Sequence, residues 1–283
     1  MNAKASVTFL SEHLRTKIGG ARKLCVAFSG GLDSSVLLAG LAELRDSRLP
    51  DIELRALHIH HGLSQFADNW VAHCQLFCQQ RNIPFTAVRV QVNRQNGGIE
   101  AAARAARYQA FAESLSENEV LLTAQHLNDQ CETFFLALKR GSGPAGLSAM
   151  SADSWTPGYR LLRPLLDISR EQLEEYATQH QLSWIEDDSN RDARFDRNFL
   201  RLDILPALYD RWPHFAEAAA RSALLCAEQE SLLDELLSES LAVLTDKQGS
   251  LAVEGLKAFS AVRRSALMRR WLASCGAKMP SRE

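Results

Sequence analysis

The chain has 283 residues, of which 46% are hydrophobic and 23% are charged, and its formal net charge is −2. This length can bury the core of one large domain or of two modest ones. The near balance of charge excludes an overall basic field, so any contact with nucleic acid must come from local patches. No apolar run is long enough to span a bilayer, and the N-terminal stretch MNAKASVTFLSEHLRTK lacks the apolar centre of a signal peptide. Six scattered cysteines without a Cys-x-x-Cys pair indicate a reduced, cytoplasmic protein with neither disulfides nor structural zinc.

Short apolar runs and amphipathic stretches alternate through the first half of the chain. The run LCVAF at 24–28 predicts a strand that leads into Gly30 and Gly31, and residues 34–44 then show helical periodicity. Three more strand–helix pairs follow, with strands at 52–60, 85–92 and 119–124 and helices at 66–80, 99–115 and 129–139. This alternation is typical of a doubly wound, Rossmann-like α/β domain with a mainly parallel sheet.

Polar residues gather where these apolar runs end. In open parallel sheets, ligands bind beyond the carboxyl ends of the strands. The residues that directly follow an apolar run, or close it, are Ser29, His60, His61, Gln125 and His126. We therefore expect a ligand site along this edge of the sheet.

The pattern changes from residue 160 onward. RLLRPLL at 160–166 predicts a last extended segment, EQLEEYATQHQL at 171–182 a charged amphipathic helix, and 214–244 one or two long helices. We place a domain boundary near 212–216, with a catalytic domain over 1–214 and a smaller, mostly helical domain over 215–283.

The turn SGGLDS at 29–34 has the composition of an anion site. A strand that passes through glycines into a helix N-terminus directs backbone N–H groups outward, where the helix dipole favours negative charge. Ser29 and either Ser34 or Ser35 add hydroxyl donors, and Ser34 can also cap the helix. The common phosphate loop has a lysine after its glycines, whereas Asp33 stands in this turn, and a carboxylate beside a phosphate indicates a divalent metal between them. A glycine turn that merely caps an ordinary helix is the alternative.

A second polar group follows the strand at 119–124. His126, Asp129 and Glu132 recur every three residues, so they share one side of the next helix. With Asp33 they form a candidate set of ligands for Mg²⁺ bound to a nucleotide. A solvated helix start is the alternative for this group, and a plain core histidine is the alternative for His58.

Taken together, the motifs resemble the tRNA(Ile)-lysidine synthetase family of PP-loop ATP pyrophosphatases. SGGLDS resembles the pyrophosphate loop S-G-G-x-D-S of that superfamily. The other segments that match the family in order and spacing are HIHHGLS (58–64), IEAAARAARYQAF (99–111), TAQHLNDQCETFFLALKRGSGPAGLSAM (123–150), RPLL (163–166) and EDDSN with DRNFLR (186–201). The similarity extends over residues 24–225, and the long middle motif is specific.

The resemblance implies an enzyme that uses ATP and Mg²⁺ to ligate L-lysine to C2 of the wobble cytidine in the CAU anticodon of tRNA(Ile). The cytidine is first adenylated, ATP yields AMP and diphosphate, and the lysidine formed changes codon and amino-acid specificity. Two alternatives stay open: another adenylating tRNA-modifying enzyme such as a thiolase, which the cysteine pattern disfavours, and a non-catalytic tRNA- or ATP-binding module. The oligomeric state is not determined by the sequence, and a homodimer is one option.

The resemblance also assigns site residues by position. The expected ATP-binding residues are Ala27, Phe28, Ser29, Gly30, Gly31, Leu32, Asp33, Ser34, His58 and His60. The expected catalytic residues are Asp33, Arg104, Arg107, His126, Asp129 and Glu132, with Asp33 and Asp129 as metal ligands. The expected tRNA or substrate contacts are Lys139, Arg140, Arg194, Arg197, Asn198 and Arg201. For the arginines outside the turn, a solvated surface is the alternative.

Two features depart from the family or extend beyond the motifs. The family normally has two consecutive aspartates where this chain has Asn128–Asp129; an amide oxygen can ligate a hard metal but carries no charge, so Asn128 either lies outside the metal site or weakens it. Family members also continue with further C-terminal RNA-binding structure, so we expect 215–283 to be the helical start of a truncated tRNA-binding domain. The arginines of RRSALMRR (263–270) are candidates for phosphate contacts there.

Overall fold

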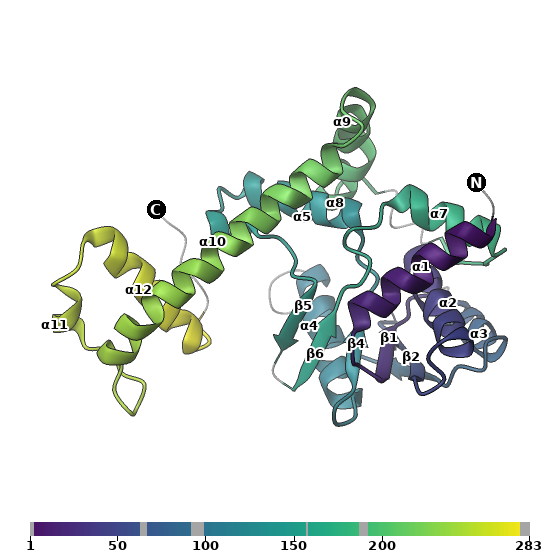
Figure 1. The fold of residues 1–283 in the computed structure, drawn as a ribbon, viewed down its shortest axis with the longest axis horizontal. Helices are drawn as coiled ribbons and strands as arrows, with labels where there is room; N and C mark the ends of the chain where they lie inside the picture. Colours follow the sequence, from purple (N-terminus) through teal and green to yellow (C-terminus); the bar gives the residue numbers. More distant parts are fainter. Residues whose placement is uncertain (1–2, 63–66, 92–98, 157, 187–191, 278–283) are drawn as a thin grey trace. The chain divides into compact units, whose positions relative to one another are not determined.

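The computed structural model describes residues 3–62, 67–91, 99–156, 158–186 and 192–277 (Figure 1). The chain forms two compact units. The larger comprises Met1–Arg140 and Ala149–Arg221, and the smaller comprises Gly141–Ser148 and Ser222–Glu283.

The larger unit is built on one six-stranded sheet with the order β3-β2-β1-β4-β6-β5. Its parallel strands are β1 (Lys23–Ala27), β2 (Glu53–His60), β3 (Phe85–Arg89), β4 (Val120–Leu122) and β6 (Tyr159–Leu162). The edge strand β5 (Asp153–Thr156) pairs antiparallel to β6. The predicted mainly parallel α/β fold is thus confirmed. The strand order reverses between β1 and β4, and such a switch point opens a crevice beyond the carboxyl ends of both strands.

Both faces of the sheet are covered by helices. On one face, α1 (Ala3–Ile18), α2 (Leu32–Ser47), α3 (Ala67–Gln79) and α7 (Arg170–Gln179) share a core with β1 through Leu24 and Val26. On the other, α4 (Ile99–Ser114) packs Phe111 against Cys25. Successive side chains of a strand point to opposite faces, so the uninterrupted apolar run of β1 serves both layers.

The segment from a π-helical turn at Leu200–Ile204 to the start of α10 (Phe215–Leu244) packs against α5 (Leu127–Lys139). A separate hydrophobic cluster joins α5 to this π-helical turn, to α9 (Leu205–Arg211) and to the first residues of α10. The short α8 (Asp196–Phe199) precedes the π-helical turn. Such turns insert one extra residue per loop of helix and often occur at functional sites, and this one carries Arg201.

The smaller unit contains α6 (Pro144–Leu147), α10 from Ser222 onward, α11 (Val253–Leu256) and α12 (Ala261–Ser274). Leu237, Leu244, Leu256 and Leu267 form its core. The region at 214–244 that was predicted as one or two helices is one continuous helix. Among the helices of the described residues, none combines the length and apolarity needed to cross a bilayer.

A small charge cluster fastens α1 to the turn that precedes α7. The Asp167 carboxylate lies 2.7 Å from Lys17 Nζ and 3.2 Å from His13 Nε2. Burial opposes the ionisation of Asp167, but the hydrogen bonds from His13 and Lys17 outweigh it and lower its pKa from 3.8 to about 2. The carboxylate form is therefore favoured by folding.

We expect Asp167→Asn to lower the free energy of unfolding by roughly 0.5–1 kcal/mol at pH 7, because the Asp167 side chain is 55% exposed and such pairs are weak. An acid whose folded pKa is depressed stabilises the fold above its unfolded pKa, and this contribution disappears as the pH falls through the folded value. The difference between variant and wild type should therefore shrink from pH 5 to pH 2, measured by urea unfolding. A difference that stays constant over this range would assign the effect to packing instead.

Candidate functional site

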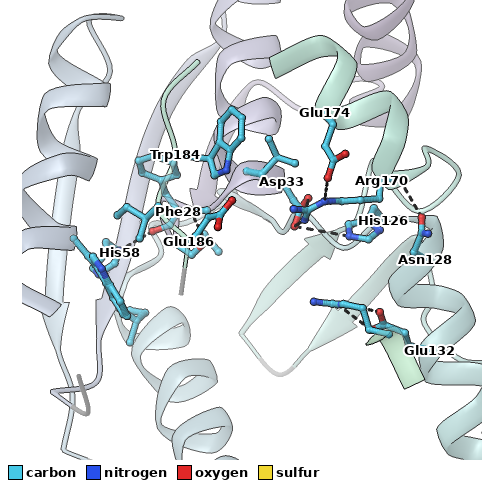
Figure 2. Close-up of a pocket in the computed structure, with 18 of the residues that line it drawn as sticks. Phe28, Asp33, His58, His126, Asn128, Glu132, Arg170, Glu174, Trp184 and Glu186 are labelled. Carbon is cyan, nitrogen blue, oxygen red and sulfur yellow. Dashed lines mark hydrogen bonds and ion pairs between the residues drawn. The ribbon is translucent and has the colours of Figure 1, made fainter. Parts of the chain in front are cut away.

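A pocket of about 1120 Å³ lies at the carboxyl ends of β1 and β2, within the larger unit. Its wall includes the loop after β1, the end of β2, the first turns of α5 and α7, the segment at 184–186, and residues from the π-helical turn and α9. Figure 2 shows Asp33, Arg170, His126 and Asn128 on one side of this pocket and Phe28, His58 and Trp184 on the other. One side therefore carries most of the charge, and the other is aromatic apart from the Glu186 carboxylate.

The two serines of SGGLDS form hydrogen bonds within the loop. Ser29 Oγ lies 3.0 Å from Ser34 Oγ and accepts a hydrogen bond from the Gly31 N–H at 3.3 Å. Ser34 Oγ donates to the Gly31 carbonyl at 3.1 Å. α2 starts at Leu32 with Gly31 as its N-cap, so the prediction that Ser34 caps the helix is wrong: the helix begins two residues before the periodicity that suggested its start. Of the predicted ATP-binding residues, all but Gly30 and Ser34 line the pocket.

Gly30 is the residue on which the loop turns. Its φ is +85°, and a Cβ at this position would lie 2.8 Å from Cys74 Sγ and 2.9 Å from Ile185 Cδ1. Its carbonyl accepts a hydrogen bond from the Ile185 N–H at 2.9 Å. The loop is therefore fixed by α3 on one side and by the segment after α7 on the other.

His58 and His60 at the end of β2 are buried beside the loop, and His61, directly after the strand, is partly exposed. His58 Nδ1 donates to the Phe28 carbonyl at 2.8 Å, and burial lowers the pKa of His58, so the ring is neutral at pH 7. His60 Nε2 lies 3.3 Å from the Asp68 carboxylate. Burial and the nearby Arg107 also lower the pKa of His61. All three histidines line the pocket.

Acids and arginines alternate on the charged side of the pocket. Arg170 Nη1 donates to both carboxylate oxygens of Asp33, at 2.8 and 3.1 Å. Arg201 binds Glu132 through two hydrogen bonds, at 2.7 and 3.0 Å, and reaches Asp129 at 3.1 Å. Burial raises the pKa of Asp33 against the opposing charges of His126 and Arg170, and it raises that of Glu132 against Arg201. The arginines thus offset part of the effect of burial, which disfavours the charge of both carboxylates.

Asn128 ties the first turn of α5 to that of α7. Its Oδ1 accepts a hydrogen bond from the Arg170 backbone N–H at 3.0 Å. This bond satisfies one of the orphan donors at the start of α7, and an amide oxygen is sufficient for it. Asn128 therefore has a structural role that does not require the negative charge of an aspartate.

The remaining predicted residues divide between pocket and surface. Arg107 lines the pocket, whereas Arg104 is exposed, with its guanidinium 5.0 Å from the Tyr108 ring centre. Of the predicted tRNA or substrate contacts, Arg201 alone is among the lining residues.

The others in that set do not line the pocket, although Arg197 Nε lies 3.6 Å from the pocket residue Glu132. Lys139 Nζ lies 2.6 Å from Asp196, and Arg140 is the C-cap of α5. Arg197 donates to Thr133 Oγ1 at 2.8 Å. The pairs Arg194 with Asp192 and Asn198 with the Asp192 carbonyl complete this surface. The motif EDDSN lies mostly outside the described residues, which include only its Glu186.

Sequence reasoning missed the contribution of α7. Arg170, Glu171 and Glu174 line the pocket, as do Trp70 and Trp184. The helix itself was predicted from its periodicity, but nothing in that pattern shows which loop its first turn faces. The one sequence signal for this contribution was the segment RPLL (163–166), which matches the family motif and lies just before α7.

The donor chemistry of the charged side suits Mg²⁺. Within the described part of the chain, no three or more His, Cys, Asp or Glu side chains form a cluster that could hold a metal ion alone. Asp33 and Asp129 nevertheless approach the same atom, His126 Nε2, at 3.8 and 3.4 Å. Mg²⁺ commonly takes one or two carboxylates and completes its shell with water and substrate phosphates, so these two residues fit a metal that arrives with a nucleotide.

The thiols near the pocket are inert. Cys131 is fully buried, and burial raises its pKa to about 11. Burial raises the pKa values of Cys74 and Cys78 to about 12. A thiol in this state supplies almost no thiolate at neutral pH.

Comparison with known proteins gives a consistent result. The PP-loop domain family matches residues 4–208, and the TilS substrate binding domain matches residues 251–283. The tRNA(Ile)-lysidine synthase of Serratia proteamaculans (strain 568) is 65% identical over 274 residues, which are 97% of this chain and 63% of that protein. The synthase of Shigella flexneri is 59% identical over 263 residues, 93% of this chain and 61% of that one. This chain thus spans about 60% of the length of these relatives.

Among solved structures, the U34-tRNA thiolase NcsA from Methanococcus maripaludis has a similar fold. Its TM-score is 0.64 at 16% identity, with 78% of this chain and 79% of that one covered. At this identity the similarity concerns the fold alone. The resemblance first seen in the motifs is confirmed by the high identity to the synthases, and the match over 4–208 shows that the chain belongs to the PP-loop domain family.

Proposed function

We propose that this chain carries the ATP-dependent ligase activity that joins lysine to C2 of the wobble cytidine of tRNA(Ile) with a CAU anticodon. The observation that carries the proposal is the charged pocket beyond β1. It combines the SGGLDS loop with Asp33, Arg170 and Arg201 in a chain 57–65% identical to tRNA(Ile)-lysidine synthases.

ATP would lie across the two sides of the pocket. The loop at the start of α2 offers backbone N–H groups and the positive end of a helix dipole to the phosphates. The aromatic side, with Phe28, His58 and Trp184, offers apolar and stacking surface to the adenine. A neutral His58 suits this side, because it adds no charge beside an uncharged base.

Asp33 and Asp129 are the residues that would hold Mg²⁺. When bound, the metal supplies positive charge to the polyphosphate. Arg201 and Arg170 add positive charge on the same side of the pocket. Preorganised charge of this kind stabilises the leaving pyrophosphate without reorganisation during the reaction.

The reaction would proceed in two steps. The cytosine 2-carbonyl oxygen attacks the α-phosphate, pyrophosphate leaves, and the ε-amine of lysine then displaces AMP from C2. The amine must lose a proton to act as a nucleophile. His126 Nε2 faces the Asp33 and Asp129 carboxylates at 3.8 and 3.4 Å, so this nitrogen can hold the two acids in place. A single-stranded anticodon loop presents its bases unpaired, as this chemistry requires.

The smaller unit is the proposed tRNA-binding part. Its residues 251–283 match the TilS substrate binding domain. Two of the arginines predicted to contact phosphates have partners within this unit: Arg270 pairs with Glu230 and Asp234, and Arg263 lies 4.4 Å from the Phe259 ring centre. Contacts to tRNA from α12 would therefore use a helix face whose arginines are already positioned by neighbouring side chains.

The thiolase alternative has less support. The similarity to NcsA concerns the fold, and the buried thiols near the pocket have raised pKa values. A sulfur-transfer reaction through a protein thiol would need an accessible thiolate. The ligase is therefore the favoured function.

We expect AMP release from α-labelled ATP to depend on an isoleucine tRNA with a CAU anticodon, and mass spectrometry of the tRNA to show a lysine adduct. The matched control is the same transcript with uridine at the wobble position, which should yield no AMP. Asp33→Asn should lower kcat/KM at least 100-fold, since it removes a carboxylate proposed to hold the Mg²⁺ that neutralises the polyphosphate. Formation of ADP, or of AMP without tRNA, would contradict the proposal, and tRNA binding without turnover would favour the non-catalytic module.

A further inference from the structure

The side chain of Arg170 stands between two carboxylates at the phosphate end of the pocket. Its Nη1 binds Asp33 at 2.8 and 3.1 Å, and its Nε binds Glu174 at 2.9 Å (Figure 2). Asp33 belongs to the SGGLDS loop, so the guanidinium lies beside the backbone that forms the proposed anion site. A cation this close to an anion site is within reach of the ligand as well as of the protein.

The position of Arg170 in its own helix is electrostatically unfavourable. It is the first residue of α7, where the helix dipole is positive and acidic side chains are preferred. The helix already has a capping box from Ser169 and Gln172, so Arg170 is not needed to begin it. A cation in such a place indicates a role other than helix stability.

The backbone of Arg170 is fixed while its side chain has room to turn. The Asn128 amide oxygen accepts the Arg170 N–H at 3.0 Å, which anchors the start of α7 to α5. The side chain is 36% exposed and lines the pocket. Arginine presents five N–H donors in a planar fork that matches phosphate as well as carboxylate. The guanidinium can therefore exchange a carboxylate partner for a phosphate partner by rotation about its side-chain bonds alone.

We propose that Arg170 is a polyphosphate-binding residue, held by Asp33 when no nucleotide is present and transferred to the β- and γ-phosphates when ATP enters. The inference rests on the proposed use of ATP and adds a residue to that site. Asp33 and Glu174 compete with the phosphates for the same guanidinium. The two carboxylates thereby keep the cation at the pocket and limit how tightly it binds the nucleotide.

The test compares two ligands that differ in the β- and γ-phosphates. We would measure, by calorimetry without tRNA, the affinities of AMP and of AMPCPP, an ATP analogue that cannot be cleaved between the α- and β-phosphates. In Arg170→Gln, the Kd of AMPCPP should rise at least tenfold while that of AMP changes less than twofold. Arg170→Lys should fall in between, because an ammonium keeps the charge but not the fork.

Two further variants separate binding from structure. Glu174→Gln removes a competing carboxylate, so AMPCPP should bind two- to fivefold more tightly, a gain that a purely structural Arg170 would not produce. Arg160→Gln is the matched control, because Arg160 pairs with Asp153 in β5, away from the pocket lining. It should leave both affinities unchanged.

Several outcomes would overturn the inference. Wild-type affinity for AMPCPP in Arg170→Gln would remove Arg170 from the phosphate site. Equal losses for AMP and AMPCPP, with a lowered Tm, would make it a structural residue, and so would weaker AMPCPP binding in Glu174→Gln. Failure of the wild-type chain to bind AMPCPP would instead contradict the proposed function, so the two failures are distinguishable.

Discussion

Arg201→Met should lower the free energy of unfolding by about 3 kcal/mol at pH 7, because it removes the nearer of two arginine partners of the buried Glu132 carboxylate and leaves only Arg197, whose Nε lies 3.6 Å away. Glu132 is 1% exposed, and its two oxygens accept hydrogen bonds from Arg201 at 2.7 and 3.0 Å. Breaking a buried pair from one side costs more than the pair itself contributes, since the remaining ion keeps its desolvation penalty. Urea unfolding followed by circular dichroism measures the loss.

The effect should depend on pH in a defined direction. Burial already raises the pKa of Glu132 in the wild type, and removal of Arg201 raises it further. An acid with a raised folded pKa destabilises the fold as the pH rises through that value, so the deficit of Arg201→Met should be smaller at pH 5 than at pH 8. Arg194→Met is the control, because Arg194 pairs with Asp192 at the surface and is 88% exposed; its unfolding midpoint should not change. A deficit of equal size at both pH values would mean that lost packing, and not a stranded charge, destabilises the variant.

Gly30→Ala should abolish measurable nucleotide binding and destabilise the larger unit by about 2 kcal/mol or more. An L-residue in the left-handed region costs roughly 1–2 kcal/mol, and Gly30 has a φ of +85°. The new methyl would also lie 2.8 Å from Cys74 Sγ and 2.9 Å from Ile185 Cδ1, so the loop or both neighbours must shift. Thermal unfolding and AMPCPP titration measure the two effects.

Gly31→Ala provides a stability control one residue away. Gly31 has a φ of −74°, and a Cβ there would lie 3.4 Å from Ser29 Oγ, an ordinary contact. We expect a change in the free energy of unfolding below about 1 kcal/mol, typical of a glycine replaced at a helix N-cap. If both alanine variants unfold at the same temperature, the strain assigned to Gly30 is wrong.

The sheet was predictable because its strands carry their signal locally. LCVAF is apolar throughout, as a strand must be when helices cover both of its sides, and the observed β1 serves two cores through Leu24 and Cys25. The loop was predictable for the same reason: strand, glycines and helix start are contiguous in sequence. The three-residue spacing predicted that His126, Asp129 and Glu132 share one side of a helix start; His126 and Glu132 line the pocket, and Asp129 pairs with Arg201 beside Glu132.

Other parts carried no local signal. β5, with the sequence DSWT, is a four-residue edge strand with no fully buried side chain, and its pairing with β6 is visible only in the fold. The helix α1 was not predicted, although Leu10, Leu14 and Ile18 are buried at helical spacing. The contact between Arg170 and Asp33 joins residues 137 positions apart, and no periodicity within either segment encodes it.

The long separation of these partners has a consequence for synthesis on the ribosome. Chains grow at about 5–20 residues per second, so the 137 residues between Asp33 and Arg170 correspond to roughly 7–27 s of translation. Glu132 is likewise synthesised before its partner Arg201, which follows 69 residues later in the chain. We therefore expect a nascent chain to keep its acidic residues in water until the segment through Arg201 has emerged, and to acquire affinity for nucleotide late in its own synthesis.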